Sequence, residues 1–171
     1  MAKKVKIIAE NLPPVPVDVI ARADRNWYLC QAEDGRRAWL SEVRYTATDG
    51  CIPEAIFSRE VAATEKRKQE ALAEMNAFWE EKTPDFHEQL IEIKEHFIYK
   101  ICEKSVCIKG FYIMPEARRG GDCKIWVSKT LIKDGKVPLW NLMNYLSIFK
   151  RKPDFPRALA KFYIFGLSIW I

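Results

Sequence analysis

Two Asp-Gly pairs beside strand-like runs constrain this chain more than any other feature. Asp34-Gly35 separates the runs 26–31 and 36–40, and Asp134-Gly135 follows a run that ends at residue 131. Glycine tolerates the positive φ of tight turns, so an Asp-Gly pair between two alternating runs is a strong hairpin signal. We therefore expect antiparallel β-structure near both ends of the chain.

The first segment, 1–57, is predicted to be β-rich. Valines recur at every second position from Val15 to Val19, and the hairpin around Asp34-Gly35 contains aromatic residues. Short strands with aromatic residues, closely spaced and separated by turns, are typical of small barrels. We interpret 1–57 as a small β-barrel-like domain with an SH3-like fold.

A connector helix is predicted over 58–82, with Ser58 as its N-cap. Its charged side chains surround one apolar face, formed by Val61, Leu72, Met75 and Trp79. Thr83-Pro84-Asp85 ends this helix or begins a shorter one, because proline is tolerated only in a first turn. We expect 58–87 to be a solvated connector, since a dimerising coiled coil needs three to four heptads of about seven residues each.

The last segment, 88–171, is predicted to be a basic antiparallel sheet closed by a terminal helix. Apolar residues alternate from Ile91 to Ile101, a strand covers 106–114, and a Gly-Gly loop over 115–122 leads to a strand over 123–131. Asp154 could cap the last helix, with Pro156 in its first turn. The apolar tail 162–171 either docks into the core as a last helix or strand, which we favour, or forms an exposed patch for a partner.

The predicted fold class is therefore α+β, and charge is unevenly divided within it. The chain has 171 residues and a net charge of +5, but residues 1–60 carry 0, residues 61–100 carry −3 and residues 101–171 carry +8. The acidic helix could cover the basic sheet, within one chain or in a homodimer. The alternative is a basic surface that meets an anionic partner.

Compartment and chemistry are indicated by what the sequence lacks. The five cysteines have no paired spacing, and the basic first residues precede no apolar signal-peptide region. The longest apolar stretch, 158–171, is shorter than the roughly 20 residues of a spanning helix. We expect a reduced, cytoplasmic protein that does not cross a membrane.

Catalytic signatures are also missing from the sequence. It has no Gly-rich phosphate loop, Gly-x-Ser-x-Gly or His-Glu-x-x-His motif, and only two histidines, His87 and His96. We expect no enzyme activity, no cofactor and no metal site. A zinc site at Cys102, Cys107, Cys123 and His96 would lack the second close cysteine pair of the usual arrangement.

Candidate binding residues gather in the basic last segment. Alternation in the strand 123–131 directs Cys123, Ile125 and Val127 to the core and leaves Lys124 and Trp126 on the wetter face. An aromatic ring beside cations is the usual platform for an unpaired base, and lysine and arginine contact phosphate. The candidate nucleic-acid-binding set is Arg118, Arg119, Lys124, Trp126, Lys129, Lys133, Lys136, Lys150, Arg151 and Lys152. Ordinary solvated charge is the alternative explanation for the same residues.

The order of strands in 106–138 carries a resemblance. The run 106–113, a short loop, the run 124–130 and Asp134-Gly135-Lys136 follow one another as in the SpoVG septation-regulator family, which this segment resembles. Trp126-Val127-Ser128 takes the place of the family's "FVxM" segment, while Thr130 stands where proline is typical. The resemblance implies a small β-rich fold that binds nucleic acid.

Two shorter stretches carry resemblances of their own. WYLCQAEDGRRAWLSEV, beginning at Trp27, looks like small barrel modules of phage-encoded proteins, which implies a phage or mobile-element origin. The stretch 111–121 is similar to the acyl-CoA loop of GNAT acetyltransferases, where backbone N–H groups at a helix N-terminus bind pyrophosphate. Here Gly120 and Gly121 are adjacent, and a strand is predicted after them.

Three functional hypotheses follow. We favour a non-enzymatic nucleic-acid-binding or regulatory protein whose partner is single-stranded DNA or RNA. The alternative is a protein-interaction module or inhibitor that binds and blocks a host protein, which the small barrel and the apolar tail support. A GNAT-like acyltransferase is the third.

Overall fold

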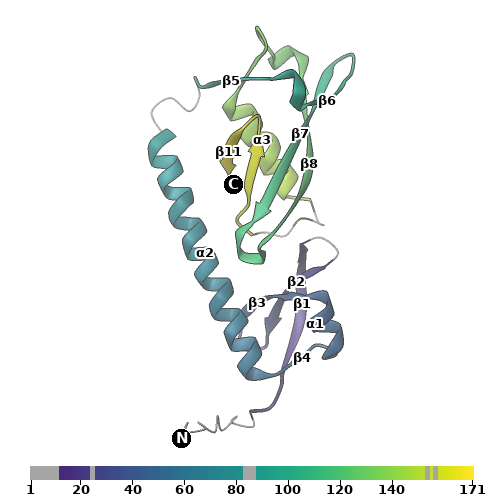
Figure 1. Ribbon diagram of the computed structural model, residues 1–171, viewed down its shortest axis with the longest axis vertical. Helices are drawn as coiled ribbons and strands as arrows, with labels where there is room; N and C mark the ends of the chain where they lie inside the picture. Colours follow the sequence, from purple (N-terminus) through teal and green to yellow (C-terminus); the bar gives the residue numbers. More distant parts are fainter. Residues whose placement is uncertain (1–11, 24–25, 83–87, 153–154, 156–157) are drawn as a thin grey trace, which may run out of the picture.

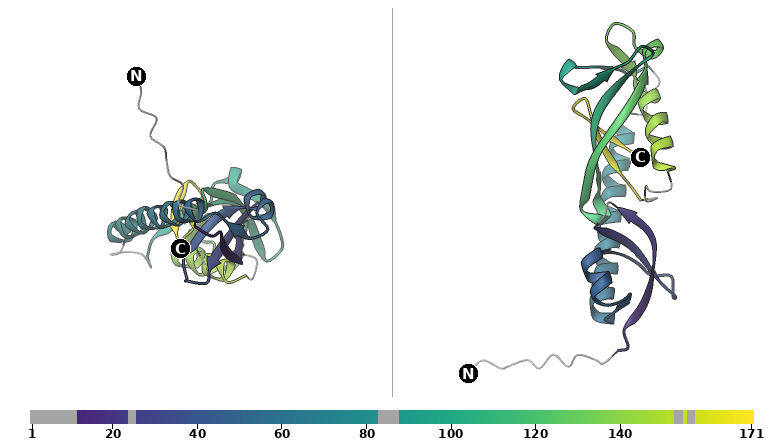
Figure 2. Two further views of the ribbon diagram at one scale, coloured as in Figure 1. Left: turned by 90° about the horizontal axis from the view of Figure 1, so that it is seen from below. Right: turned by 90° about the vertical axis from the view of Figure 1, so that its right-hand side faces the viewer.

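The computed structural model describes residues 12–23, 26–82, 88–152, 155 and 158–171. The described residues form a mixed α/β fold with three α-helices and antiparallel sheets. A curled N-terminal sheet and a larger C-terminal sheet lie one above the other in Figure 1, and one long helix runs beside both. The side view in Figure 2 shows the same elongated arrangement.

The N-terminal sheet is a curled half-barrel in the strand order β3-β2-β1-β4. Its elements are β1 (Val15–Ala23), β2 (Trp27–Ala32), β3 (Arg37–Ser41), the short helix α1 (Glu42–Ala47) and β4 (Cys51–Ile52). The predicted hairpin at Asp34-Gly35 is confirmed, because β2 pairs with β3 in register from Trp27↔Ser41 to Gln31↔Arg37. Gly35 takes the positive φ, at +86°, and its N–H donates to the Ala32 carbonyl.

The long helix α2 (Glu54–Lys82) begins four residues earlier than predicted. Ser58 is therefore not its N-cap: it lies inside the helix, where its hydroxyl donates to the Glu54 carboxylate at 2.5 Å. The predicted stop at Thr83-Pro84-Asp85 lies outside the described residues, and so do residues 1–11 of the first predicted domain. None of the helices in the described ranges is both long and apolar enough to cross a bilayer.

The C-terminal sheet is built around one long central strand. Its elements are β6 (Ile98–Ile101), β7 (Ser105–Met114), β8 (Arg119–Ser128), β10 (Lys161–Ile164) and β11 (Leu167–Trp170). β8 pairs with the full length of β7 on one side, while β6 and β10 share its other side and β11 extends the sheet beyond β10. β8 is therefore an edge strand.

Shorter elements join these strands. They are β5 (Leu90–Glu92) with its partner β9 (Lys136–Pro138), the 3₁₀ turns η2 (Glu95–Phe97), η3 (Pro115–Ala117) and η4 (Lys129–Leu131), and the helix α3 (Leu139–Lys150). The turn predicted at Asp134-Gly135 is confirmed: both residues have positive φ, and Lys133 and Lys136 exchange backbone hydrogen bonds across it.

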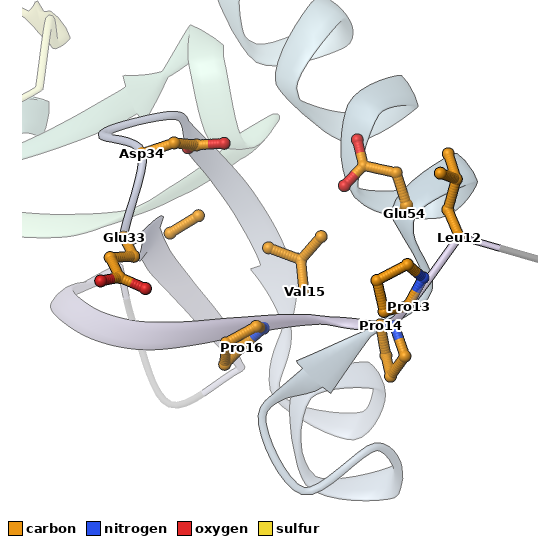
Figure 3. Close-up of a pocket in the computed structure, with 9 residues that line it drawn as sticks. Leu12, Pro13, Pro14, Val15, Pro16, Glu33, Asp34 and Glu54 are labelled. Carbon is orange, nitrogen blue, oxygen red and sulfur yellow. The ribbon is translucent and has the colours of Figure 1, made fainter.

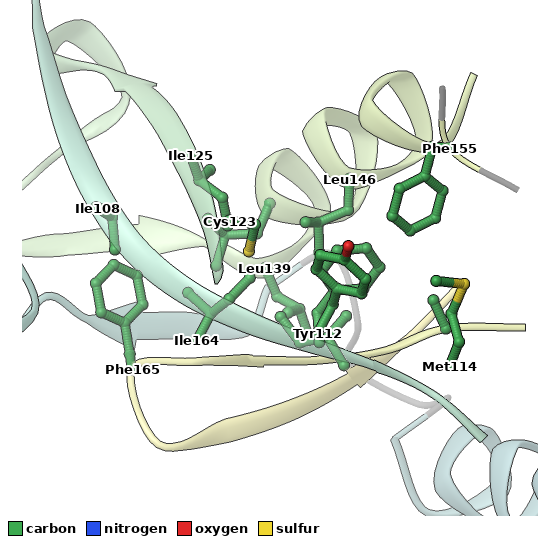
Figure 4. Packing of buried hydrophobic residues seen from close by; sticks show 14 of the residues in the cluster. Ile108, Tyr112, Met114, Cys123, Ile125, Leu139, Leu146, Phe155, Ile164 and Phe165 are labelled. Carbon is green, nitrogen blue, oxygen red and sulfur yellow. The ribbon is translucent and has the colours of Figure 1, made fainter. Parts of the chain in front are cut away.

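The main core lies between the C-terminal sheet and α3. Leu142 and Leu146 of α3 are fully buried against inward-facing residues of the sheet such as Ile108, Ile125 and Phe162. Figure 4 shows α3 lying over these strands, with Tyr112 and Phe155 among the packed rings. A second, smaller cluster fills the N-terminal half-barrel.

The predicted terminal helix is wrong, because the tail is a β-hairpin. Phe162, Ile164, Ile169 and Trp170 are all buried, so the expectation that the tail docks into the core is confirmed, with strands rather than a helix. An isolated apolar run does not distinguish the two by itself. The proposed cap Asp154 and Pro156 lie outside the described residues, and α3, which was not predicted, precedes the hairpin.

The Gly-Gly loop is also corrected. Gly120 and Gly121 belong to β8, opposite Ile113 and Tyr112 of β7. A Cβ at Gly120 would lie 2.6 Å from Cζ of Phe111 and would overlap the Tyr112 carbonyl oxygen. The two glycines therefore make room for aromatic rings, and no helix N-terminus follows them as in an acyl-CoA loop.

The alternation predicted from Ile91 to Ile101 is broken in the structure. Ile91 is buried, but Tyr99 and Ile101 are 50% and 62% exposed. η2 interrupts the run, and a bulge between Ile98 and Lys100 shifts the register of β6. A bulge redirects the side chains that follow it, which is why one parity does not hold across the segment.

Buried polar contacts join the two sheets. Trp39 of β3 is fully buried in the C-terminal core, and its Nε1 donates to the Glu116 carboxylate at 3.3 Å. Arg67 of α2 donates to the Glu116 carbonyl at 2.7 Å. The half-barrel, α2 and η3 therefore meet at Glu116, and this junction positions the C-terminal sheet.

Candidate functional site

The side of β6, β7 and β8 that faces away from α3 is a concentrated exposed surface of cations and aromatic rings. We call it the outer face, and it comprises Tyr99, Lys100, Lys109, Phe111, Lys124 and Trp126. The alternating burial of β8 confirms the sequence prediction: Cys123, Ile125 and Val127 are buried, while Lys124 and Trp126 are exposed.

Strand register places two lysines directly opposite each other on this face. Lys109 of β7 pairs with Lys124 of β8. The Nζ atoms lie 5.1 Å (Lys109) and 4.2 Å (Lys124) from the centroid of the Tyr99 ring, within cation–π range. The bulge in β6 brings Tyr99 to this position beside its neighbour Lys100. One aromatic ring is therefore within cation–π range of both ammonium groups.

The charge of this pair is not neutralised by a salt bridge. Among the described residues, no recorded ion pair includes Lys109 or Lys124. Asp122 shares the face, two residues from Lys124 along β8. The three lysines of the outer face and the neighbouring Asp122 thus carry a net charge of +2. Like charges directly opposite on a sheet are destabilising, so this arrangement favours an anion above it.

Exposed rings surround the lysine pair. Trp126 is 43% exposed and Phe111 40%, and Trp126 lies opposite the buried Cys107, two pairs further along the strands than the lysines. Large exposed aromatic side chains gathered in one patch mark interaction sites more often than scattered ones do. The outer face therefore offers both charge and stacking surface.

The backbone under the site is held by α3. The Tyr145 hydroxyl donates to the Lys124 carbonyl at 3.2 Å, at the free edge of β8. Burial raises the pKa of Tyr145, and a hydrogen bond with the Trp126 backbone opposes that rise. Tyr145 therefore occupies the backbone groups of the two residues whose side chains define the site.

The other predicted residues are dispersed. Lys129 in η4, and Lys133 and Lys136 beside the Asp134-Gly135 turn, are exposed beyond the Trp126 end of β8. Arg118 and Arg119 lie at the opposite end, with Arg119 about 23 Å from Trp126 at roughly 3.3 Å per residue. Arg119 is half-buried, and its Nε is enclosed without a hydrogen-bond partner.

The cluster Lys150-Arg151-Lys152 does not join the outer face, because α3 packs against the inner one. The Nζ of Lys150 donates to the Ile171 carbonyl at 2.8 Å, and burial lowers the pKa of Lys150. The Nζ of Lys152 lies 5.2 Å from the Phe149 ring centroid. Lys150 is therefore part of the packing around α3, while Arg151 and Lys152 are exposed.

Sequence reasoning missed Lys109 and Tyr99. The alternation of β7 indicates that Lys109 points outward. Its pairing with Lys124 depends on the strand register, which the sequence alone does not specify. Tyr99 was assigned to the same parity as the core residue Ile91. Tyr99 is exposed because of the bulge in β6, and no feature of the sequence predicts that bulge.

Two hollows elsewhere are lined by polar groups that bind other parts of the fold. A hollow of about 540 Å³ beside β1 contains Asp34 and Glu54 (Figure 3), but both carboxylates bind Arg36, at 2.6 Å each. A hollow of about 360 Å³ between β3 and α2 contains Glu116 and Thr64, which hold Trp39 by its side chain and its backbone N–H. These polar groups have structural partners.

The thiols are mostly protected. Burial raises the pKa of Cys30 and of Cys123 to about 12, and it also raises that of Cys107, whereas Cys51 is exposed. In the part of the chain that the structure describes, no three His, Cys, Asp or Glu side chains are grouped to hold a metal ion.

The outer face must be interpreted from its own geometry. Comparison of the chain with protein-family models, with curated proteins and with solved structures finds no match.

Proposed function

We propose that this protein is a non-enzymatic nucleic-acid-binding or regulatory protein and that the outer face is its binding surface. The observation that carries the proposal is the cross-strand pair Lys109 and Lys124, held over one Tyr99 ring with no salt bridge among the described residues. A phosphate placed between the two ammonium groups would relieve their repulsion.

The surroundings of the pair favour a polymer over an isolated anion. Lys129, Lys133 and Lys136 extend positive charge beyond the Trp126 end of β8, and exposed Trp126 lies between them and the pair. Positive charge with interleaved aromatic side chains is the footprint of a nucleic-acid-binding surface. Arg118, Arg119 and Lys150–Lys152 take no part in this proposal.

The rest of the chain is proposed to support this role. The curled half-barrel of β1–β4 is proposed to be an SH3-like module, on the strength of its short antiparallel strands and tight hairpin. A cytoplasmic location and a phage or mobile-element origin are further proposals, supported by the sequence features given above.

Salt-dependent binding tests the proposal. A labelled mixed-sequence oligonucleotide is titrated with the full chain, followed by fluorescence anisotropy, from about 50 mM salt upward. We expect binding that weakens with salt. The double variant Lys109→Gln, Lys124→Gln should reduce the slope of log affinity against log salt by about 1.4, or 0.7 for each lost phosphate contact.

A matched control removes the same charge elsewhere. Lys66→Gln with Lys68→Gln lies on α2, where both residues are exposed, and should leave the slope close to that of the wild type. Absence of binding at about 50 mM salt, where phosphate contacts are strongest, would overturn the proposal.

A second candidate function is binding to a host protein, as a module or inhibitor. Ile101 of β6 and Leu90 of β5 are 62% and 56% exposed, more apolar surface than phosphate contacts require. Here Ile101→Asp would abolish a purified complex, while the double lysine variant would leave it intact. The opposite pattern would favour nucleic acid.

A further inference from the structure

We propose that the outer face binds one unpaired nucleotide of a single strand, with its base stacked on Trp126 and its phosphate on Lys109 and Lys124. This inference rests on the proposed function. It assigns different tasks to the two exposed rings and distinguishes single strands from duplexes.

Tyr99 and Trp126 have different surroundings. The face of the Tyr99 ring is occupied by the Lys124 ammonium group at 4.2 Å, with the Lys109 ammonium group at 5.1 Å. Within the described ranges, no recorded cation–π contact involves Trp126, which is 43% exposed. Tyr99 is therefore a positioning residue for the cations, and Trp126 is the ring that is open to a base.

The spacing suits a base and its own phosphate. Trp126 and Lys124 are two residues apart on the same face of β8, which is about 7 Å along the strand. Lys109 stands directly across from Lys124. The stacking position and the phosphate position are thus adjacent, and Tyr145 holds the β8 backbone beneath both.

The same geometry indicates where the strand continues. Asp122 and its partner Phe111 lie on the other side of the lysine pair, and the Asp122 carboxylate repels phosphate there. Exposed Lys129 lies three residues beyond Trp126. The strand is therefore expected to run from the lysine pair across Trp126 toward η4, leaving Phe111 outside the contact.

A duplex does not fit this arrangement. Its bases are covered on both faces by their stacked neighbours, so a ring fixed on a sheet meets only phosphates and groove edges. Stacking on an aromatic side chain requires a base that has been released from the stack, as in single strands and loops. The stacking contribution is then available only for unpaired nucleotides.

The experiment compares three probes with the full chain: a single-stranded oligonucleotide, its duplex and a nucleoside monophosphate. Trp126→Leu is expected to weaken single-strand binding by roughly 5- to 150-fold, which corresponds to one lost stacked base, and to leave duplex binding unchanged. Trp126→Phe should recover part of the loss. The control Ile148→Ala, at an exposed apolar residue of α3 away from the outer face, should have little effect. The unfolding midpoint of each variant verifies that it is folded.

Other outcomes separate this inference from the proposed function. Equal affinity for duplex and single strand, with an effect of the lysine variants but none of Trp126→Leu, would overturn the inference and leave nucleic-acid binding standing. A nucleoside monophosphate that binds as tightly as the strand would overturn recognition of a polymer. If no probe binds at about 50 mM salt, both proposals fall.

Discussion

The N-terminal half-barrel and the outer face of the C-terminal sheet differ in how their charges are paired. Around the N-terminal half-barrel, arginines of the β2–β3 turn and α1 are paired with acids: Arg36 bridges Asp34 and Glu54, and Arg44 binds Glu60 at 2.7 Å. On the outer face of the C-terminal sheet, Lys109 and Lys124 stand opposite each other without such a match. The charged side chains of the first region are paired within the protein. The two lysines of the second are left for an anionic ligand.

The unpaired lysines of the outer face destabilise the fold but can bind an anion. Unmatched like charges oppose folding, and they are tolerated when the surrounding structure fixes them and a ligand compensates for them. The long β7–β8 ladder and the core under α3 supply that fixed support. We therefore expect charge changes in the two regions to have different consequences.

Reversing the lysine pair should produce the largest effect. Lys109→Glu with Lys124→Glu places two acids on the outer face and removes two charge-assisted contacts, so affinity for single-stranded nucleic acid should fall by more than roughly 100-fold. The measurement is anisotropy at about 50 mM salt. The matched reversal Lys66→Glu with Lys68→Glu on α2 should leave binding nearly intact, and equal losses in both variants would remove the distinction between the two surfaces.

Gly120→Ala tests the scaffold without changing charge. Its Cβ would press on the Phe111 ring and on the Tyr112 backbone, so unfolding should become easier by about 1–3 kcal/mol. Denaturant unfolding measures the change. Binding per folded molecule should stay close to wild type, because the outer face keeps its charges. If the free energy of unfolding is unchanged, the strands shift freely to admit the methyl group, and the expected clash is absent.

These particular residues show what sequence alone can supply. The Asp34-Gly35 and Asp134-Gly135 turns are local features, and alternation within β8 correctly exposes Trp126. Gly120-Gly121 was taken for a loop because two glycines usually break a strand, whereas the reason for them is a ring from the neighbouring strand. A local sequence pattern does not predict which distant segments of the chain pack closely together.

The site was partly predictable for the same reason. Lys124 and Trp126 follow from a period of two within one strand, but Lys109 and Tyr99 join them only through register and a bulge. The helix α3 was missed because its start carries no capping signal: Pro138 precedes it and makes no side-chain cap hydrogen bond. Apolar residues in the tail fit a helix or a strand, and only pairing with β7 selects the strand.

Lowering the pH should weaken the matched region selectively. Hydrogen bonds from Arg36, and then Ser58, lower the pKa of Glu54 to about 2. A carboxyl group whose pKa is depressed on folding contributes stability above its unfolded pKa, near 4.5, and that contribution is lost as the pH falls toward 2. In urea unfolding between these values, Glu54→Gln should show a shallower loss of stability than the wild type. Lys124→Gln should retain the wild-type slope, and an unchanged slope in Glu54→Gln would contradict the assignment.

The smallest expected change in stability, that of Lys124→Glu, tests most directly whether the two regions differ in how their charges are paired. Lys124→Glu alone gives Lys109 an acid directly across the strands, which makes the outer face resemble the N-terminal sheet. Replacing repulsion by attraction in an exposed cross-strand pair should raise the free energy of unfolding by about 0.2–1 kcal/mol. The same change should weaken nucleic-acid binding at least tenfold, because the phosphate loses one cation and meets an acid. Thermal unfolding and anisotropy on one sample measure both quantities. A gain in stability with a loss of binding means that the lysine pair is kept for its ligand at the expense of the fold. A loss of both would mean that the contact of Lys124 with the Tyr99 ring outweighs the repulsion from Lys109 and would contradict the comparison.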